Sequence, residues 1–217
     1  MKVMSKLADK AYDLAICDPP YQVDMSGGKA PKNGFKSRAH WDKMKVWDAA
    51  RPDAAYFDEL RRVSKNQIIW GGNYFTPHLP PSMGWVFWYK MQDNFSFGDG
   101  EFAYTSFNQK SRIFQYARGM ESGFAPAGNT GGSQNIHPTQ KPVRLYSWLL
   151  EKYAKPGDRI LDTHMGSGSS VIAALERGFE MLACEIDAEY FATAVERIGR
   201  YEQQGTFAMT RNNQADR

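Results

Sequence analysis

Cysteine is scarce in this sequence, and long apolar runs are absent from it. The 217 residues include two cysteines, Cys17 and Cys184, too few for the disulfide framework of a small secreted domain. Each lies in an apolar stretch, which favours buried free thiols in a reducing compartment. No run of about 18 apolar residues occurs, and the first six residues lack the apolar core of a secretory leader. We therefore expect a cytoplasmic protein without a membrane contact.

Metal-binding patterns are also missing. The four histidines are His40, His78, His137 and His164, and neither a CxxC nor an HxxxH pattern occurs. Zinc and related ions need such groupings of imidazole and thiolate ligands. We expect no metal ion.

What is present is the patterning of a folded α/β domain. The length suits one domain covering residues 1–217, with 42% hydrophobic and 24% charged residues. Short β-rich runs alternate with helical periodicity, which is typical of βαβ units and a mostly parallel sheet. Strands are expected at 12–17, 67–70, 84–90, 101–107, 159–161, 180–184 and 207–210, and helices at 54–65 and 169–177 and beginning at Pro142 and Asp187. The strands at 84–90 and 101–107 are expected to form an antiparallel pair.

Two segments, 22–53 and 108–136, have no sustained period and are expected to be loop insertions. The net charge is only +3, but cations gather in these loops with aromatic side chains between them. Such loops suit phosphate contact and base stacking, although a solvated basic loop would have the same composition. The candidate nucleic-acid contacts are Lys29, Lys32, Lys36, Arg38, Trp41, Lys110, Arg112 and Arg118.

A glycine-rich turn follows the expected strand at 159–161. It reads Asp162-Thr163-His164-Met165-Gly166-Ser167-Gly168 and leads into a helix, so its backbone can approach a ligand closely. The next strand ends at Glu185, about 20 residues later, where an acid accepts hydrogen bonds from ribose hydroxyls. A dinucleotide would favour a third glycine where this chain has Val171. Asp162 suits a cationic ligand better, so S-adenosylmethionine, a sulfonium, is the favoured cofactor.

A second candidate site is the loop Asp18-Pro19-Pro20-Tyr21, which follows the expected strand at 12–17. The Asp18 carboxylate and the Pro19 carbonyl could each accept an N–H bond from an exocyclic base amine. The lone pair of that amine would then be directed at a methyl donor, with Tyr21 offering its ring to the base. An ordinary Asp-Pro-Pro turn is the alternative for this loop taken alone.

With these motifs in this order, the chain resembles the amino-methylating DNA methyltransferases of the permuted β type. In that family the catalytic loop precedes the cofactor loop, and His137-Pro138-Thr139-Gln140-Lys141-Pro142 is similar to its additional cofactor motif. The segments 69–75 and 101–107 are similar to those of compact phage and prophage members.

The resemblance implies a Rossmann-like methyltransferase fold with circularly permuted motif order, a seven-stranded mostly parallel sheet and one antiparallel strand. It implies S-adenosylmethionine as cofactor and S-adenosylhomocysteine as product. Asp18, Pro19, Pro20 and Tyr21 would hold a base flipped out of the duplex. The implied cofactor positions are Cys17, Asp18, His137, Thr139, Lys141, Asp162, His164, Gly166, Ser167, Gly168, Glu185 and Ile186.

The implied function is site-specific methylation of adenine N6 in double-stranded DNA, since Asp rather than Ser heads the loop. Cytosine N4 and RNA base amines stay open as alternatives. A catalytically silent nucleic-acid-binding subunit is disfavoured, because both motifs are intact. The resemblance further suggests a restriction–modification setting in a prokaryotic or phage-infected cell, and a homodimer could supply additional target contacts.

Overall fold

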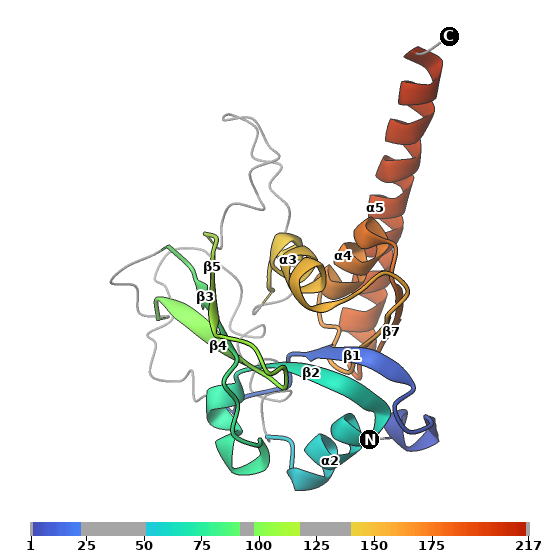
Figure 1. Cartoon of the computed structure of the whole chain (residues 1–217). Helices are drawn as coiled ribbons and strands as arrows, with labels where there is room; N and C mark the ends of the chain where they lie inside the picture. Colours follow the sequence, from blue (N-terminus) through green and yellow to red (C-terminus); the bar gives the residue numbers. More distant parts are fainter. Residues whose placement is uncertain (1, 23–50, 92–97, 118–139, 216–217) are drawn as a thin grey trace, which may run out of the picture. The chain divides into compact units, whose positions relative to one another are not determined.

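The computed structural model describes residues 2–22, 51–91, 98–117 and 140–215, with side chains described as far as residue 203. Contacts within the chain divide it into two compact units, Met1–Met120 and Glu121–Arg217. Both units combine strands with helices (Figure 1). Asp18 belongs to the first unit, and the glycine turn at 166–168 belongs to the second.

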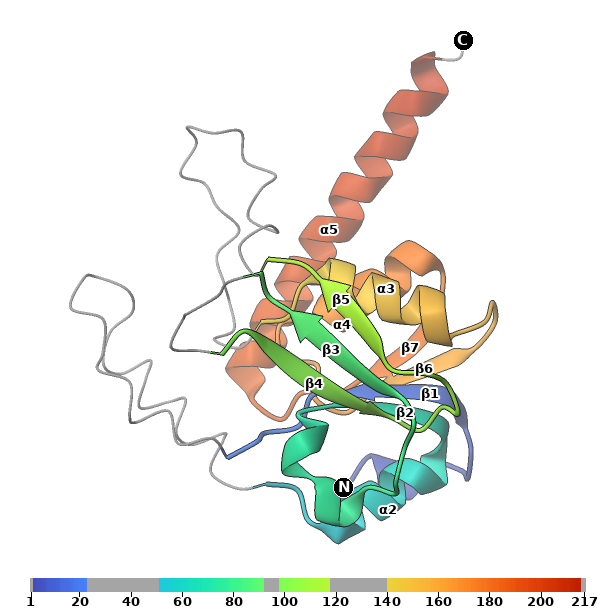
Figure 2. The same cartoon turned by 60° about the vertical axis from the view of Figure 1, so that its left-hand side comes forward.

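The first unit contains five of the described strands, and their pairing is mixed parallel and antiparallel. In spatial order its strands are β5 (Arg112–Gln115), β3 (Trp85–Tyr89), β4 (Gly100–Thr105), β2 (Ser64–Trp70) and β1 (Tyr12–Cys17). β1 runs parallel to β2 and β3 parallel to β5, whereas β4 is antiparallel to both of its neighbours. Figure 2 shows β3, β4 and β5 side by side. The predicted antiparallel pair is confirmed, and β4 is the antiparallel strand.

The strand register brings two loops to one edge of this sheet. Cys17, the last residue of β1, pairs with Ile69, one residue before the end of β2. The segments that begin at Asp18 and Gly71 therefore leave the sheet together at its carboxyl edge. Ligands of open α/β sheets bind at that edge.

One amphipathic helix, α2 (Ala54–Val63), packs on β2 of this unit (Figure 1). Asp53 caps it, because its Oδ1 accepts a hydrogen bond from the Tyr56 amide at 3.1 Å. Phe57 and Leu60 are fully buried, and each such burial contributes about 1.5–3 kcal/mol. The helix ends two residues before the predicted residue 65, since β2 already begins at Ser64.

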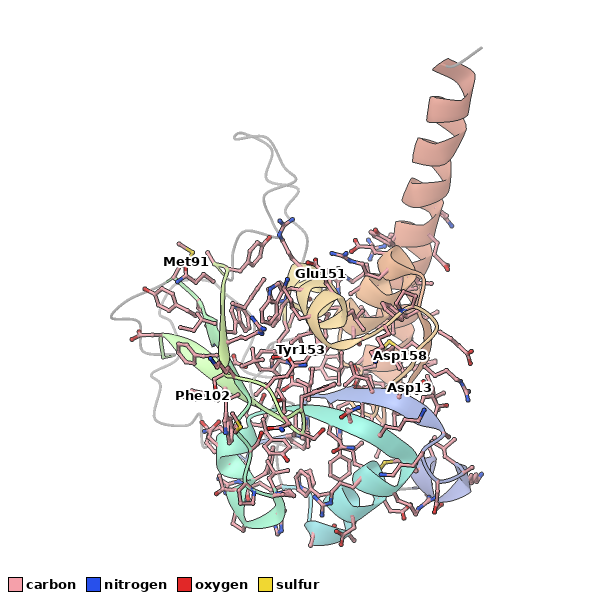
Figure 3. The ribbon with its side chains drawn as sticks, viewed as in Figure 1. Asp13, Met91, Phe102, Glu151, Tyr153 and Asp158 are labelled. Atoms are coloured by element: carbon pink, nitrogen blue, oxygen red, sulfur yellow. The ribbon has the colours of Figure 1, made fainter. Side chains whose placement is uncertain are left out.

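The outer strands bury one face more completely than the other. Val86 and Trp88 of β3 are buried, whereas Phe102 of β4, labelled in Figure 3, is 46% exposed. Such alternation is the two-residue period of a strand with one face in the core. Short 3-10 turns complete the unit at Met4–Lys6, Gly72–Tyr74 and Thr76–His78.

The second unit contains a βαβ element, as predicted. β6 (Arg159–Asp162) and β7 (Glu180–Ala183) pair in parallel, and α4 (Ser169–Arg177) connects them. α3 (Val143–Tyr153) packs against α4, and Glu151 of α3 pairs with Arg177 at 3.2 Å (Figure 3). Gly178 ends α4 in the left-handed conformation, with φ of 71°.

The last helix, α5 (Ala188–Ala215), differs from the prediction in its carboxyl-terminal part. Asp187 caps it as expected, since its Oδ1 accepts from the amides of Glu189 and Tyr190. Phe191 and Val195 are 47% and 49% exposed, whereas the smaller Ala194 is buried. The predicted strand at 207–210 is wrong, because the helix continues through these residues. Although α5 is long, no described helix is apolar enough to cross a membrane.

The predicted loop insertions are described in part. Within 22–53, residues 23–50 lie outside the described residues, and Gln22 and 51–53 form neither helix nor strand. Within 108–136, residues 118–136 lie outside them, and β5 occupies 112–115. The loop prediction is therefore wrong for β5, a four-residue strand too short to show a period.

Candidate active site

The loop Asp18-Pro19-Pro20-Tyr21 begins directly after β1, at the carboxyl edge of the first sheet. Asp18 and Tyr21 are half-buried, whereas Pro19 is buried. The Tyr21 hydroxyl donates a hydrogen bond to Asp18 Oδ1, so the first and last residues of the loop are tied together. The Asp18 carboxylate, a candidate from the sequence, is thus positioned to accept a hydrogen bond.

Aromatic rings hold Tyr21 in this orientation. Its ring stacks on Tyr74 with centroids 5.2 Å apart and an interplanar angle of 19°. Phe75 meets it edge-on at 6.1 Å. One face of Tyr21, expected to be offered to a base, is therefore covered by Tyr74, which is itself 37% exposed.

Gly71 gives the Tyr21 ring its space. Its φ of +65° is a left-handed conformation, and a Cβ at this position would stand 2.2 Å from Tyr21 Cε1. Only a residue without a side chain fits both requirements. The glycine that ends β2 thus shapes the site built on the loop after β1.

Arg51 joins the same cluster from the segment before α2. Its Nε donates a hydrogen bond to the Tyr21 carbonyl at 2.6 Å, and its guanidinium lies over the Tyr74 ring at 5.5 Å. No pattern in the sequence marks Arg51, because it is one cation among many in an aperiodic stretch.

In the second unit, the glycine loop is held by two acidic residues. Asp162 is buried, and its Oδ1 accepts from the His164 amide at 2.9 Å while its Oδ2 accepts from Ser170 Oγ at 2.6 Å. Glu185 Oε2 accepts from the Gly166 amide and its Oε1 from the Asp187 amide, both at 2.9 Å. Both carboxylates therefore hold the loop backbone in place, a structural role that the sequence did not indicate.

The loop backbone depends on Gly166 and Gly168, whose φ angles are 53° and 77°. A Cβ on Gly168 would stand 3.0 Å from Ile198 Cδ1 of α5, so the loop lies directly against that helix. Beside the loop, Ile186 is 97% exposed and follows Glu185. An exposed apolar side chain next to an acid suits a ligand with a flat ring and a polyhydroxyl part.

Arg197 of α5 is the functional candidate that the sequence missed in this unit. Its Nη1 donates to the Ser167 carbonyl at 2.9 Å and to Ser169 Oγ at 2.9 Å. A single guanidinium thus braces the turn between Gly166 and α4. Thirty residues separate Arg197 from Ser167 in sequence, and no motif marks that relationship.

Burial also changes the titration of two neighbours of this loop. It lowers the pKa of His164 to about 4, which keeps the imidazole neutral, and His164 Nδ1 lies 2.9 Å from Thr163 Oγ1. Burial, followed by the nearby Asp162 carboxylate, raises the pKa of the Cys184 thiol. Cys17 is buried and Cys184 half-buried, and both are free thiols.

The predicted additional cofactor motif is described only from Gln140 onwards, so His137 and Thr139 lie outside the described residues. Lys141 is 3% exposed, a buried cation just before α3. Gln140 Oε1 is shielded from solvent and has no hydrogen-bond partner among the described residues. Buried acceptors normally have a donor.

Most candidate nucleic-acid contacts lie outside the described residues, namely Lys29, Lys32, Lys36, Arg38, Trp41 and Arg118. Lys110 and Arg112 are exposed near β5. In the strand register, Arg112 of β5 is opposite Val86 of β3, and Val86 is opposite Ala103 of β4. Ala103 is in turn opposite Trp70, the last residue of β2. Arg112 is therefore level with the end of β2, about 14 Å away across three strand spacings. Within the described part of the chain, no three His, Cys, Asp or Glu side chains form a metal-binding group.

Comparison with known proteins places this geometry in a family. The model of the N6/N4 methyltransferases, described as DNA methylase, matches residues 35–196, well over half of the chain. The chain belongs to this DNA methylase family.

Two relatives illustrate the membership. The methylase is 36% identical over 213 residues to YubD of Escherichia coli (strain K12), which is named as a methylase, with 94% of this chain and 91% of YubD covered. It is 21% identical over 234 residues to the type II methyltransferase M.HpaI of Haemophilus parainfluenzae, covering 91% and 71% of the two chains.

Solved structures share the fold of the methylase. TTHA0409 of Thermus thermophilus, crystallised with S-adenosylmethionine, matches with a TM-score of 0.55 and 16% identity over 92% of each chain. The cytosine-N4-specific PvuII DNA methyltransferase matches with a TM-score of 0.54 and 10% identity over 93% and 88% of the two chains. The methylase therefore has the α/β fold of S-adenosylmethionine-dependent DNA methyltransferases, as predicted from its sequence.

Proposed function

We propose that this methylase transfers a methyl group from S-adenosylmethionine to the N6 amino group of an adenine in double-stranded DNA. The observation that carries the proposal is the Asp18 carboxylate, half-buried at the carboxyl end of β1 and accepting a hydrogen bond from Tyr21. The order of the loops, with Asp18 before the glycine turn, supports membership of the permuted β type.

The proposed role of Asp18 is to make the weakly nucleophilic N6 amine of adenine more reactive. The lone pair of an exocyclic adenine amine is delocalised into the ring, so it is poorly available for attack. Asp18 and the Pro19 carbonyl would each accept one N–H of the amine, which favours a tetrahedral nitrogen with its lone pair directed at the methyl group. Catalysis is then positioning and electrostatic stabilisation, and the proton leaves the nitrogen after transfer.

The Tyr21 hydroxyl occupies the hydrogen-bonding position that the substrate amine would take at Asp18. It donates to the same Asp18 oxygen that would accept an amine N–H. An incoming amine would replace or share this donor, so Asp18 is never an unsolvated, unpaired carboxylate before the base arrives.

The second unit fits S-adenosylmethionine, the cofactor of this methyltransferase family, by the chemistry of its donors and acceptors. The cofactor carries a methyl group on a sulfonium, an adenosine and an amino-acid tail. Glu185 would bind the ribose and Ile186 would cover the adenine ring. Gln140 Oε1, a shielded acceptor without a partner among the described residues, fits a ligand that brings N–H donors, such as the ammonium of that tail. Lys141 is placed next to it in the sequence to meet the carboxylate.

The choice of adenine N6 rests on Asp18, since an aspartate heads the loop where a serine would favour cytosine N4. Cytosine N4 is the second candidate, because the family includes both activities and PvuII methyltransferase, a structural neighbour, is cytosine-N4-specific. Both reactions use the same cofactor and the same kind of amine.

The proposal extends to the setting of the enzyme. Its partner is duplex DNA, with the target base flipped out of the stack, and its location is the cytoplasm of a prokaryotic or phage-infected cell. Recognition of the target sequence is assigned to the insertions 22–53 and 108–136. A homodimer and an accompanying restriction enzyme belong to the same proposal.

Transfer of label from methyl-labelled S-adenosylmethionine to DNA tests the function. We expect the purified protein to label duplex DNA and Asp18→Ala to abolish the label while still binding S-adenosylhomocysteine. Label transferred to RNA but not to duplex DNA would contradict the proposal, as would full activity of Asp18→Ala.

A further inference from the structure

The candidate for a new contact is a three-layer stack of Tyr21, Tyr74 and Arg51, which begins at the last residue of the catalytic loop. Tyr21 stacks on Tyr74, and the Arg51 guanidinium lies over Tyr74. Arg51 and Tyr74 are both exposed, so the outermost layer of the stack is a cation in contact with solvent.

Arg51 has two ends with different surroundings. Its Nε donates to the Tyr21 carbonyl at 2.6 Å, which ties the guanidinium to the catalytic loop. Its two terminal Nη groups have no acceptor among the described residues. An arginine carries five donors in a planar fork, and the Nη pair alone can bind two oxygens of a phosphate.

We propose that Arg51 binds a backbone phosphate next to the target nucleotide and transmits that contact to the catalytic loop through the Tyr21 carbonyl. This inference rests on the proposed function, because it assigns the ligand to the DNA strand that carries the target base. The cation is exposed, its guanidinium lies over the Tyr74 ring, and its Nε donates to the loop that contains Asp18. A lysine could supply the charge but not the fork, so the two roles of Arg51 are separable by substitution.

The matched control is Lys65, an exposed cation of the same unit at the start of β2. It pairs with Asp13 at 2.6 Å, and the register places this pair four residues before the Cys17–Ile69 pair that adjoins the catalytic loop. Lys65→Ala therefore removes one positive charge from the same unit at the opposite end of the strands.

The test measures binding of a short duplex that contains a methylated site, with S-adenosylhomocysteine present, between roughly 50 and 200 mM salt. One phosphate contact contributes about 0.9 to the slope of log K against log salt. We expect Arg51→Ala to lower the slope by about that amount and to weaken binding roughly tenfold at low salt. Lys65→Ala should keep the wild-type slope. Arg51→Lys should keep the slope but lower kcat at saturating DNA, because the bond to the Tyr21 carbonyl is lost.

An unchanged salt slope in Arg51→Ala would overturn the inference while leaving the proposed function standing, provided that the wild type methylates the duplex. Loss of slope in Lys65→Ala to the same extent would also overturn it, because the effect would then follow net charge. A wild-type protein that neither binds nor methylates duplex DNA would overturn the proposed function and this inference together.

Discussion

Gly71 lies so close to the Tyr21 side chain that a Cβ on the glycine would stand 2.2 Å from the tyrosine ring. The two residues follow different strands, β2 and β1, so the residue after β2 determines where the Tyr21 ring of the Asp18–Tyr21 loop lies. The position of Tyr21 relative to Asp18 therefore depends on a residue 50 positions away in the chain.

Gly71→Ala should remove activity out of proportion to its effect on stability. The left-handed φ of +65° costs an alanine about 1–2 kcal/mol, and the Tyr21 ring must also move. We expect methyl transfer to fall about a hundredfold, because the site tolerates little misplacement. Steady-state kinetics and thermal unfolding measure the two effects.

Gly98→Ala is the control for this substitution, since its φ is +71° and, apart from its chain neighbours, no atom of the described residues lies within 4 Å of the added Cβ. It should carry the same conformational cost with near-normal activity. Equal losses of activity in the two variants would show that the contact with Tyr21 is unimportant.

Arg197→Ala should weaken cofactor binding rather than catalysis. Removal of the bonds to the Ser167 carbonyl and Ser169 Oγ frees the glycine loop, so we expect the Kd for S-adenosylhomocysteine to rise roughly tenfold, about 1.4 kcal/mol. At saturating cofactor, kcat should stay near the wild-type value. Isothermal titration calorimetry and a KM-against-kcat comparison measure this split.

Arg200→Ala serves as the control on the same helix, because Arg200 is exposed and makes a long 3.9 Å ion pair with Glu196. It should bind the cofactor product like the wild type. A normal Kd in Arg197→Ala, or an equal loss in Arg200→Ala, would remove the positioning role from Arg197.

His164 should make the protein sensitive to acid. Its folded pKa of about 4 lies below the ordinary value of 6.5, so the unfolded chain takes up a proton that the folded chain resists. Above pH of about 6.5 His164 is neutral in both states and does not change the stability. Between about pH 6.5 and 4 the unfolded chain binds the extra proton, so the free energy of unfolding falls by at most about 1.4 kcal/mol per pH unit. Urea denaturation at several pH values should show a smaller fall in His164→Gln. Parallel curves for the two proteins would contradict the assignment.

The sequence predicted what local chemistry determines. Strand β1, which ends just before Asp18, the glycine turn before α4 and the cap at Asp187 each depend on residues that are close in sequence, and the structure confirms these elements. The roles of the predicted site residues toward base and cofactor stay predictions.

What the sequence missed depends on contacts between distant segments. Arg197 reaches Ser167 across 30 positions, and Arg51 reaches Tyr21 across the same separation. In α5, Phe191 and Val195 have the spacing of a buried face but are half-exposed, whereas the smaller Ala194 is buried. Size and hydrophobicity alone do not reveal which face meets the glycine loop.

The central claim is that Asp18 presents an adenine amine to the methyl donor, and the identity of the methylated nucleoside tests it most directly. Duplex DNA containing all four bases is treated with enzyme and S-adenosylmethionine, digested to nucleosides and analysed by mass spectrometry. We predict N6-methyladenine with the wild type and none with Asp18→Ala. N4-methylcytosine as the sole product would contradict the assignment of adenine.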